Sequence, residues 1–158
     1  MRPIASVSNE ATRARASLAA SGAPEPRARR TRQQDESRRI ALLAARAGLE
    51  KKAEAVEIID VTGKVDYADY LVVMTGSSDR NVAAIADAVA GDLAREGIRA
   101  IASEGLPLAH WVLIDFVDVV VHVFQREARS VYNLDGLWMD AGRVATGESL
   151  ADGAERSH

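Results

Sequence analysis

Gly76, Ser77 and Ser78 are the first residues of this 158-residue chain whose types and spacing could support chemistry. They stand between an apolar, strand-like run and a helix-like run, and the backbone N–H groups at such a junction can hold a phosphate. The segment has neither a Walker lysine nor a G-x-G-x-x-G pattern. A serine that caps an ordinary helix is therefore the more common explanation.

Three further polar residues lie in an apolar stretch. Asp115 and Asp118 could act as paired metal carboxylates, but no third ligand is near them and aspartate is frequent at hairpin turns. His122 stands in an apolar run without HxH or HExxH spacing, which is typical of a hydrogen-bonded core histidine. Because spacing yields no set of nucleophile, base and orienting group, we expect no enzymatic activity, no cofactor and no metal.

These residues must be positioned by the stretch Trp111–Phe124, which reads WVLIDFVDVVVHVF. Two apolar runs rich in β-branched residues, Trp111–Ile114 and Val119–Phe124, flank a short segment with an aspartate at each end. The runs have the length of strands, so the pattern predicts a β-hairpin. Both faces of the second run are largely apolar, which indicates interior strands covered on two sides.

The rest of the core sequence alternates between strand-like and helix-like segments, which predicts a single α/β domain with a five-stranded sheet flanked by helices. If the strands on either side of the central helix are parallel neighbours, that helix makes a right-handed crossover. Gly97 is well placed to end it. The remaining expected strands are 55–60, 70–75 and 98–103, and the expected helices begin at Ser37 (apolar stripe Ile40, Leu43, Ala44, Ala47), begin after Ser77 or Ser78 (Val82, Ile85, Ala86, Val89, Leu93), and span 127–134.

The two ends of the chain differ from residues 37–140 in composition. Residues 1–36 are rich in Ala, Arg, Ser and Pro, which predicts a disordered basic tail. Residues 141–158 lack periodicity, which predicts a second flexible tail. The basic cluster Arg27, Arg29, Arg30 and Arg32 could make a weak contact with RNA, although a purely solvated extension is the plainer interpretation.

Charge and composition restrict the location of the protein. Residues 1–39 have a net charge of +5 and residues 40–158 a net charge of −8, so the acidic domain is unsuited to gripping nucleic acid unaided. The chain has no cysteine, and no apolar run approaches the roughly 20 residues of a membrane span. An Arg- and Ser-rich leader also suits an organelle transit peptide, but Glu10 and Glu25 favour a cytoplasmic bacterial protein.

The aromatic residues point to a different kind of function. The chain has only seven, yet Trp111, Tyr132 and Trp138 fall in the hairpin and in the segment that follows it. They could be core residues, or they could anchor a protein–protein interface, where Trp and Tyr are enriched. Composition leaves both interpretations open.

Four segments in this order resemble the ribosomal silencing factor, or Iojap, family over residues 40–140. They are DYLVVMTGSSDRNVAAIAD (Asp69–Asp87), EG (Glu104-Gly105), the stretch Trp111–Phe124, and RSVYNLDGLW (Arg129–Trp138). The resemblance implies a small mixed-sheet α/β domain, similar to the nucleotidyltransferase fold but without its catalytic carboxylates. Val117 stands where the family usually has glycine, and Asp135 where it usually has glutamate. If position 117 requires φ > 0, valine is costly there.

The resemblance also implies a function. Members bind the large ribosomal subunit at its ribosomal protein fourteen and block joining of the small subunit when nutrients are scarce. We therefore expect a monomeric or homodimeric translation repressor, whose basic N-terminal tail could make a weak contact with ribosomal RNA. The alternatives are a large-subunit assembly factor, as in the organellar branch of the family, and a nucleotide- or phosphate-handling enzyme that uses the polar residues described first.

On this hypothesis, particular residues build the partner-binding site. We expect Asp118, His122 and Arg129 to orient the hairpin and the final helix. The docking surface or its supporting shell is expected to comprise Trp111, Val112, Tyr132, Leu134 and Trp138.

Overall fold

The apolar stretch at residues 111–124 forms an antiparallel hairpin, which confirms the sequence prediction. The computed structural model describes residues 27–146 and pairs β4 (Trp111–Asp115) with β5 (Val119–Gln125), with Trp111 opposite Phe124. Every residue of β4, and all of β5 except Gln125, is buried. Both strands are interior, as their two apolar faces require.

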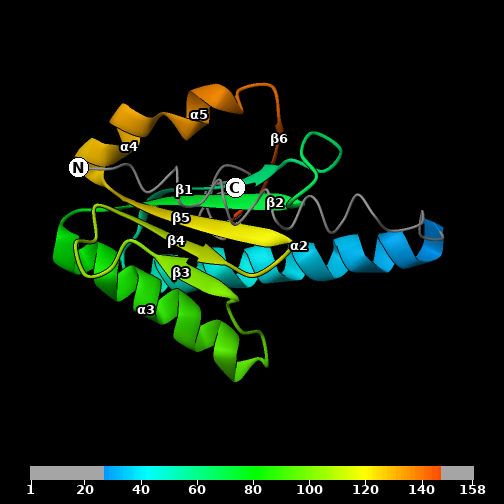
Figure 1. Cartoon of the computed structure of the whole chain (residues 1–158), viewed down its shortest axis with the longest axis horizontal. Coiled ribbons are helices and arrows are strands. Elements are labelled where there is room, and N and C mark those ends of the chain that lie inside the picture. The colour runs from blue at the N-terminus through cyan, green and yellow to red at the C-terminus, as the bar shows by residue number, and fades with distance from the viewer. Residues whose placement is uncertain (1–26, 147–158) are drawn as a thin grey trace, which may run out of the picture.

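The hairpin is part of a six-stranded mixed sheet with the order β3-β4-β5-β2-β1-β6 (Figure 1). Only the β2–β5 pair is parallel. The prediction of five strands is wrong by one, because three residues of the expected C-terminal tail pair with β1. The other strands are β1 (Glu54–Asp60), β2 (Tyr70–Gly76), β3 (Ala102–Glu104) and β6 (Gly142–Val144).

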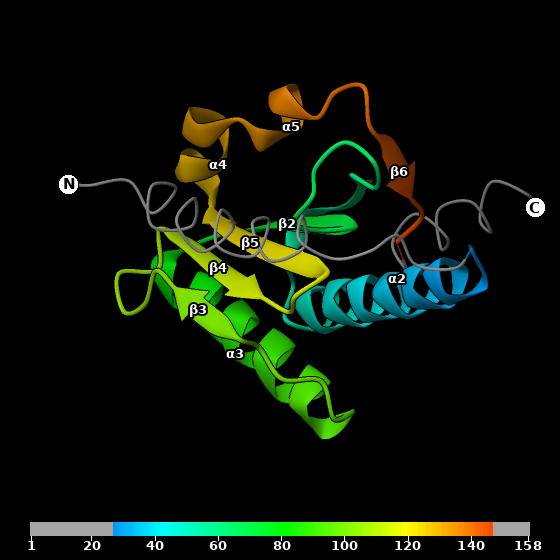
Figure 2. The same cartoon turned by 45° about the vertical axis from the view of Figure 1, so that its right-hand side comes forward.

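Helices cover both faces of the sheet, so that two apolar layers are buried (Figures 1 and 2). The strand residues of one layer pack against α2 and α3, and those of the other pack against α4 and α5. None of the helices within residues 27–146 is long and apolar enough to cross a membrane. The helices are α2 (Arg27–Glu50), α3 (Asp79–Arg95), α4 (Arg126–Tyr132) and α5 (Leu134–Leu137).

Helix α3 has the predicted stripe and ends, but the strand expected after it is shorter. Ser78 caps the helix, and Gly97 has φ +79 at its end. The Ile98 N–H donates to the Leu93 carbonyl at 2.8 Å and so belongs to the helix terminus. The predicted strand 98–103 is therefore wrong over residues 98–101, and β3 begins at Ala102.

The strands on either side of α3, β2 and β3, are not parallel neighbours, so α3 does not make the simple right-handed crossover that the sequence suggested. The parallel neighbour of β2 is β5, with Tyr70 opposite Val119, whereas β3 lies at the far edge of the sheet. The chain passes from β2 through α3, β3 and β4 before it returns beside β2. A long connection of this kind is not visible in local sequence patterns.

Helix α2 begins at Arg27, ten residues before the predicted start, so residues 27–36 are helical and the prediction that they are disordered is wrong. Arg, Ala, Gln and Glu are good helix formers, and nothing in this segment interrupts a helix. Ser37 lies within the helix, and its hydroxyl donates to the Gln33 carbonyl at 2.9 Å. The disorder predicted for residues 1–26 and the flexibility predicted for residues 147–158 concern residues outside the described range.

Val117 occupies the strained position that its sequence suggested, with φ +80 in the hairpin turn. Valine disfavours positive φ, and its side chain is exposed here, so glycine loses little packing. We expect Val117→Gly to raise the free energy of unfolding by roughly 1 kcal/mol, as measured by urea denaturation. Val117→Ala keeps a Cβ, so it should raise the free energy of unfolding by less than Val117→Gly does. A glycine variant that is less stable than wild type would contradict the assignment of strain.

Candidate functional site

A cluster of aromatic rings lies where the hairpin meets α4. Trp111 on β4 packs against Phe124 on β5 with ring centroids 4.9 Å apart, and against Tyr132 on α4 at 4.3 Å. The Trp111 indole N–H donates to Nδ1 of His122 at 3.0 Å. Trp111 is only 3% exposed, so it supports the overlying helix rather than forming the outer surface. The core interpretation therefore holds for Trp111, and an interface role for Tyr132 and Trp138, which are only half-buried, stays a prediction.

The polar partner inside this cluster is a neutral histidine. Burial lowers the pKa of His122 to about 4, so its imidazole is uncharged at pH 7. Because Nδ1 accepts the indole N–H, the single ring proton belongs on Nε2. This confirms the expectation of a hydrogen-bonded core histidine.

The lowered pKa of His122 predicts a pH dependence of stability. Below pH 6.5 the unfolded chain protonates this histidine, while the folded protein resists protonation until about pH 4. The free energy of unfolding should be independent of His122 above pH 6.5 and fall by roughly 3 kcal/mol between pH 6.5 and 4. Burial raises the pKa of Asp69, which acts in the opposite sense. The test is therefore the difference between wild type and His122→Gln in urea titrations; equal pH slopes would contradict the prediction.

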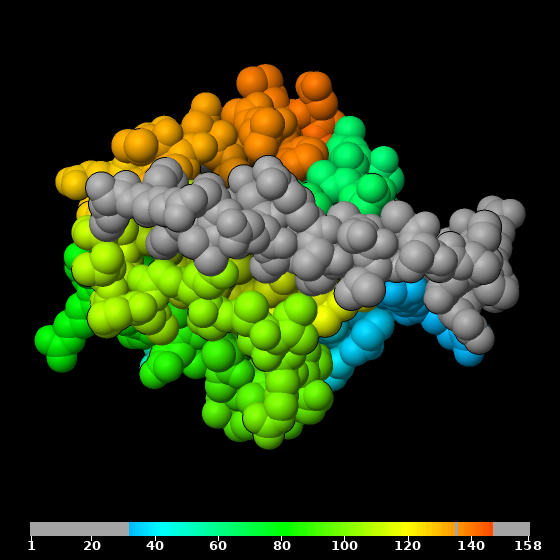
Figure 3. All heavy atoms as spheres, in the orientation of Figure 1, coloured from blue at the N-terminus to red at the C-terminus, as the bar shows by residue number. Residues whose placement is uncertain are grey.

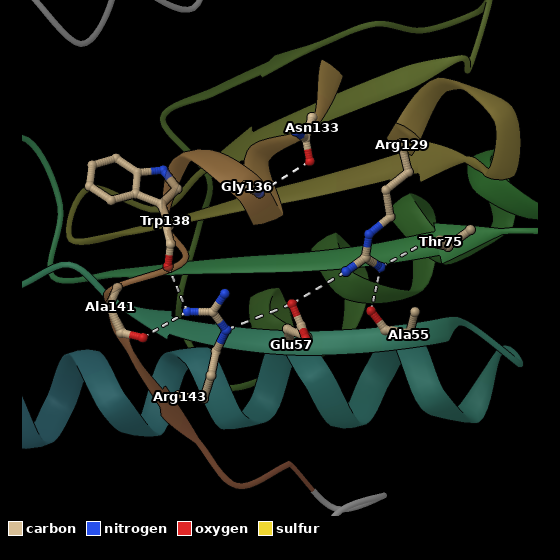
Figure 4. Close-up of polar contacts among 9 residues, drawn as sticks. All are labelled: Ala55, Glu57, Thr75, Arg129, Asn133, Gly136, Trp138, Ala141 and Arg143. Carbon is tan, nitrogen blue, oxygen red and sulfur yellow. Dashed lines mark hydrogen bonds and ion pairs between the residues drawn. The ribbon is translucent and has the colours of Figure 1, made fainter. Parts of the chain in front are cut away.

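Arg129 ties α4 to the sheet below it (Figure 4). Its guanidinium donates to Thr75 Oγ1 on β2 at 2.8 Å and to the Ala55 carbonyl on β1, and it lies 3.5 Å from Glu57 Oε2. The side chain is only 12% exposed, which strengthens these charge-assisted bonds. The expectation that Arg129 orients the final helix is consistent with this geometry.

Glu57 extends the same network to the last strand. Its Oε2 lies 3.7 Å from Nε of Arg143 on β6, and Arg143 Nη1 donates to the carbonyls of Trp138 and Ala141 at 3.0 and 2.9 Å (Figure 4). The segment after α5 is therefore fixed at its far end, as Arg129 fixes α4. Arg143, which makes these contacts, lies in the region 141–158 that the sequence pattern predicts to be a flexible tail.

Asn133 divides the predicted helix 127–134 into two. It has φ +46, ends α4 and caps α5, and its side-chain oxygen accepts the Gly136 N–H at 3.1 Å. A Cβ on Gly136 would lie 2.5 Å from Asn133 Nδ2, so a larger residue there would push the Asn133 side chain out of its capping position. Asparagine tolerates the left-handed region better than other non-glycine residues, which explains its position.

The segment of residues 131–139, which we call the α4–α5 segment, carries exposed apolar side chains. Val131, Leu137 and Met139 are 77%, 69% and 74% exposed, and Tyr132, Leu134 and Trp138 are half-buried against the sheet. Its helices form the upper surface in the space-filling view (Figure 3). An apolar surface on a firmly held support suits the docking of another protein.

Two of the predicted site residues do not join the others. Val112 is fully buried in the apolar layer under α2 and α3, because neighbours in a strand point to opposite faces and Trp111 faces α4. Asp118 lies in the hairpin turn at the start of β5, whereas α4 follows the end of β5. Its carboxylate accepts a bond from the Gln33 side chain of α2 at 3.4 Å.

The residues considered first for phosphate or metal chemistry are used internally. Ser78 Oγ accepts the Asn81 N–H at 3.1 Å, and the Asn81 side chain accepts the Ser77 N–H at 3.0 Å. Asp115 is buried, and its Oδ1 accepts the Val117 N–H at 2.8 Å, which closes the turn. Among residues 27–146 there is no group of three His, Cys, Asp or Glu side chains that could hold a metal.

Comparison with known proteins identifies similar chains. The profile of the family described as ribosomal silencing factor during starvation matches residues 34–158. Ribosomal silencing factor RsfS of Bacillus subtilis is 43% identical over 102 residues, which are 65% of this chain and 86% of the relative. The chloroplastic protein Iojap of Zea mays is 29% identical over 102 residues, 65% of this chain and 44% of that protein.

Solved structures are similar as well. A crystal structure of a Chromobacterium violaceum protein has a TM-score of 0.63 at 34% identity, covering 64% of this chain and 84% of that one. A Bacillus halodurans structure has a TM-score of 0.58 at 39% identity, covering 65% and 92%.

Proposed function

Because the chain belongs to the ribosomal silencing factor family, we propose that it represses translation by binding the large ribosomal subunit and preventing the small subunit from joining it. The observation that carries the proposal is the exposed apolar α4–α5 segment, held on a buried aromatic cluster. Silencing by steric occlusion requires affinity and position, which a rigid docking surface provides.

The proposed partner surface is a protein, chiefly ribosomal protein fourteen of the large subunit. Val131, Leu137 and Met139 would enter its apolar pockets, with the half-buried Tyr132 and Trp138 beside them. Aromatic and apolar anchors of this kind dominate the energetics of protein interfaces. Leu134 packs against the sheet and supports the same segment.

Arg129, Trp111 and His122 act in this proposal as positioning residues. They hold the α4–α5 segment in one arrangement before the partner arrives, which reduces the entropy lost on binding. We leave Val112 and Asp118 out of the proposed surface, because Val112 packs in the opposite apolar layer and Asp118 accepts a hydrogen bond from Gln33 of α2.

Charge supports association with the ribosome. Residues 40–158 have a net charge of −8, and ribosomal proteins that contact RNA are basic. Opposite charges increase the rate of encounter and favour correct partners. We propose a cytoplasmic bacterial location, although the maize relative is described as chloroplastic.

A subunit-joining assay tests the function. Purified large and small subunits are mixed at a magnesium concentration that favours joining, with or without the protein, and are separated on sucrose gradients. We expect the joined fraction to fall when the protein is added to large subunits first. An unchanged joined fraction at saturating protein would contradict silencing; accumulation of large-subunit precursors in a deletion strain would favour the assembly alternative.

A further inference from the structure

The N-terminal half of α2 is a helical projection with little support from the sheet. Figures 1 and 2 show the beginning of α2 running past the end of the sheet. Residues 32–36 are exposed, and Ser37 is the first buried position among the described side chains of the helix. Ser37 Oγ is 2.9 Å from Asp69 Oδ2, and this contact fixes the helix where it leaves the domain.

This projection has the opposite charge to the body of the protein. Residues 27–39, which we call the basic arm, contain six arginines and two acids, a net charge of +4. Residues 40–146 contain ten basic and sixteen acidic side chains, a net charge of −6. These opposite charges nearly cancel, since they sum to −2 over residues 27–146.

We propose that the basic arm binds the phosphate backbone of structured RNA. A helix of 13 residues is about 18 Å long and can follow several consecutive phosphates. Arginine matches phosphate oxygens with paired N–H donors. Arg39 forms exposed ion pairs with Glu36 and Glu96, and such pairs are weak enough to exchange for phosphate.

The composition of the arm favours RNA over a membrane surface. Residues 27–39 read RARRTRQQDESRR and contain no large apolar side chain, whereas helices that insert into a membrane surface have an apolar face. Helix α2 also packs on the face of the sheet opposite to α4 and α5, so the arm and the α4–α5 segment can be engaged together.

The test measures binding of the full chain to a fluorescently labelled RNA hairpin of about 16 base pairs by anisotropy, at 50 to 200 mM KCl. We expect a dissociation constant in the micromolar range and a slope of log affinity against log salt of about −4, as five phosphate contacts give. The variant replaces Arg27, Arg29, Arg30 and Arg32 by glutamine, which preserves helix propensity. It should bind at least about tenfold more weakly, with a slope reduced to about −1, because Arg39 remains.

A matched control removes the same charge elsewhere, by substituting glutamine for Arg46, Arg80, Arg95 and Arg99. We expect less than a twofold change in affinity for this control. Equal weakening in both variants would overturn the proposal in favour of an effect of net charge, and tighter binding to phosphatidylglycerol vesicles than to RNA would overturn it in favour of a membrane. Because isolated RNA is the ligand, the result does not depend on the proposed docking to the large subunit.

Discussion

Trp111→Ala is expected to lower the free energy of unfolding by about 4 kcal/mol, the range found for truncating a buried aromatic residue. Trp111 is 3% exposed and contacts Phe124 and Tyr132, so its removal leaves a cavity between β4 and α4. It also leaves His122 Nδ1 without its donor. Urea denaturation followed by circular dichroism measures the change.

Trp111→Phe separates the two contributions. Phenylalanine retains much of the apolar volume but cannot donate to His122, so we expect a loss of roughly 2 kcal/mol from the unsatisfied acceptor and the smaller ring. A loss of less than about 1 kcal/mol in Trp111→Ala would show that the aromatic cluster does not support the overlying helix.

The double substitution of Leu137 and Met139 by glutamate is expected to weaken binding to the large subunit about 100-fold. Both side chains are exposed, so stability should change by less than about 0.5 kcal/mol while a charge enters the centre of the proposed interface. Affinity can be measured with fluorescently labelled protein and purified large subunits.

The matched control places two glutamates on exposed apolar residues elsewhere. Ile101 and Leu108 are 56% and 59% exposed and lie outside the α4–α5 segment. We expect this control to bind as wild type does. Equal weakening by both pairs would remove the α4–α5 segment from the interface and attribute the effect to added negative charge.

The sequence pattern predicts the elements that are determined by residues close together in the chain. The hairpin 111–124 follows from β-branched runs and flanking aspartates, and α3 follows from its stripe, its serine cap and Gly97. The strand β6 has only three residues, and its pairing with β1 depends on contacts about 85 residues apart in the chain. The start of α2 was missed because a basic, polar helix lacks an apolar stripe.

The candidate site was predictable in part. Trp111 and Tyr132 were grouped correctly because a helix that follows a strand directly must pack near it. Val112 cannot share a surface with Trp111, because neighbouring residues of a strand point to opposite faces of the sheet. The Arg129–Glu57 contact joins residues 72 positions apart. The exposure of Leu137 and Met139 depends on how the break at Asn133 turns α5, and no local pattern contains that information.

Co-sedimentation of the purified wild-type protein with large subunits, with small subunits and with joined ribosomes tests the central claim most directly. We expect the protein to sediment with free large subunits but not with small subunits or with joined ribosomes. The proposed binding site on the large subunit is absent from the small subunit, and it is covered once the two subunits join. Binding to none of the three particles, or equal binding to small and large subunits, would contradict a silencing function based on occlusion of the large subunit.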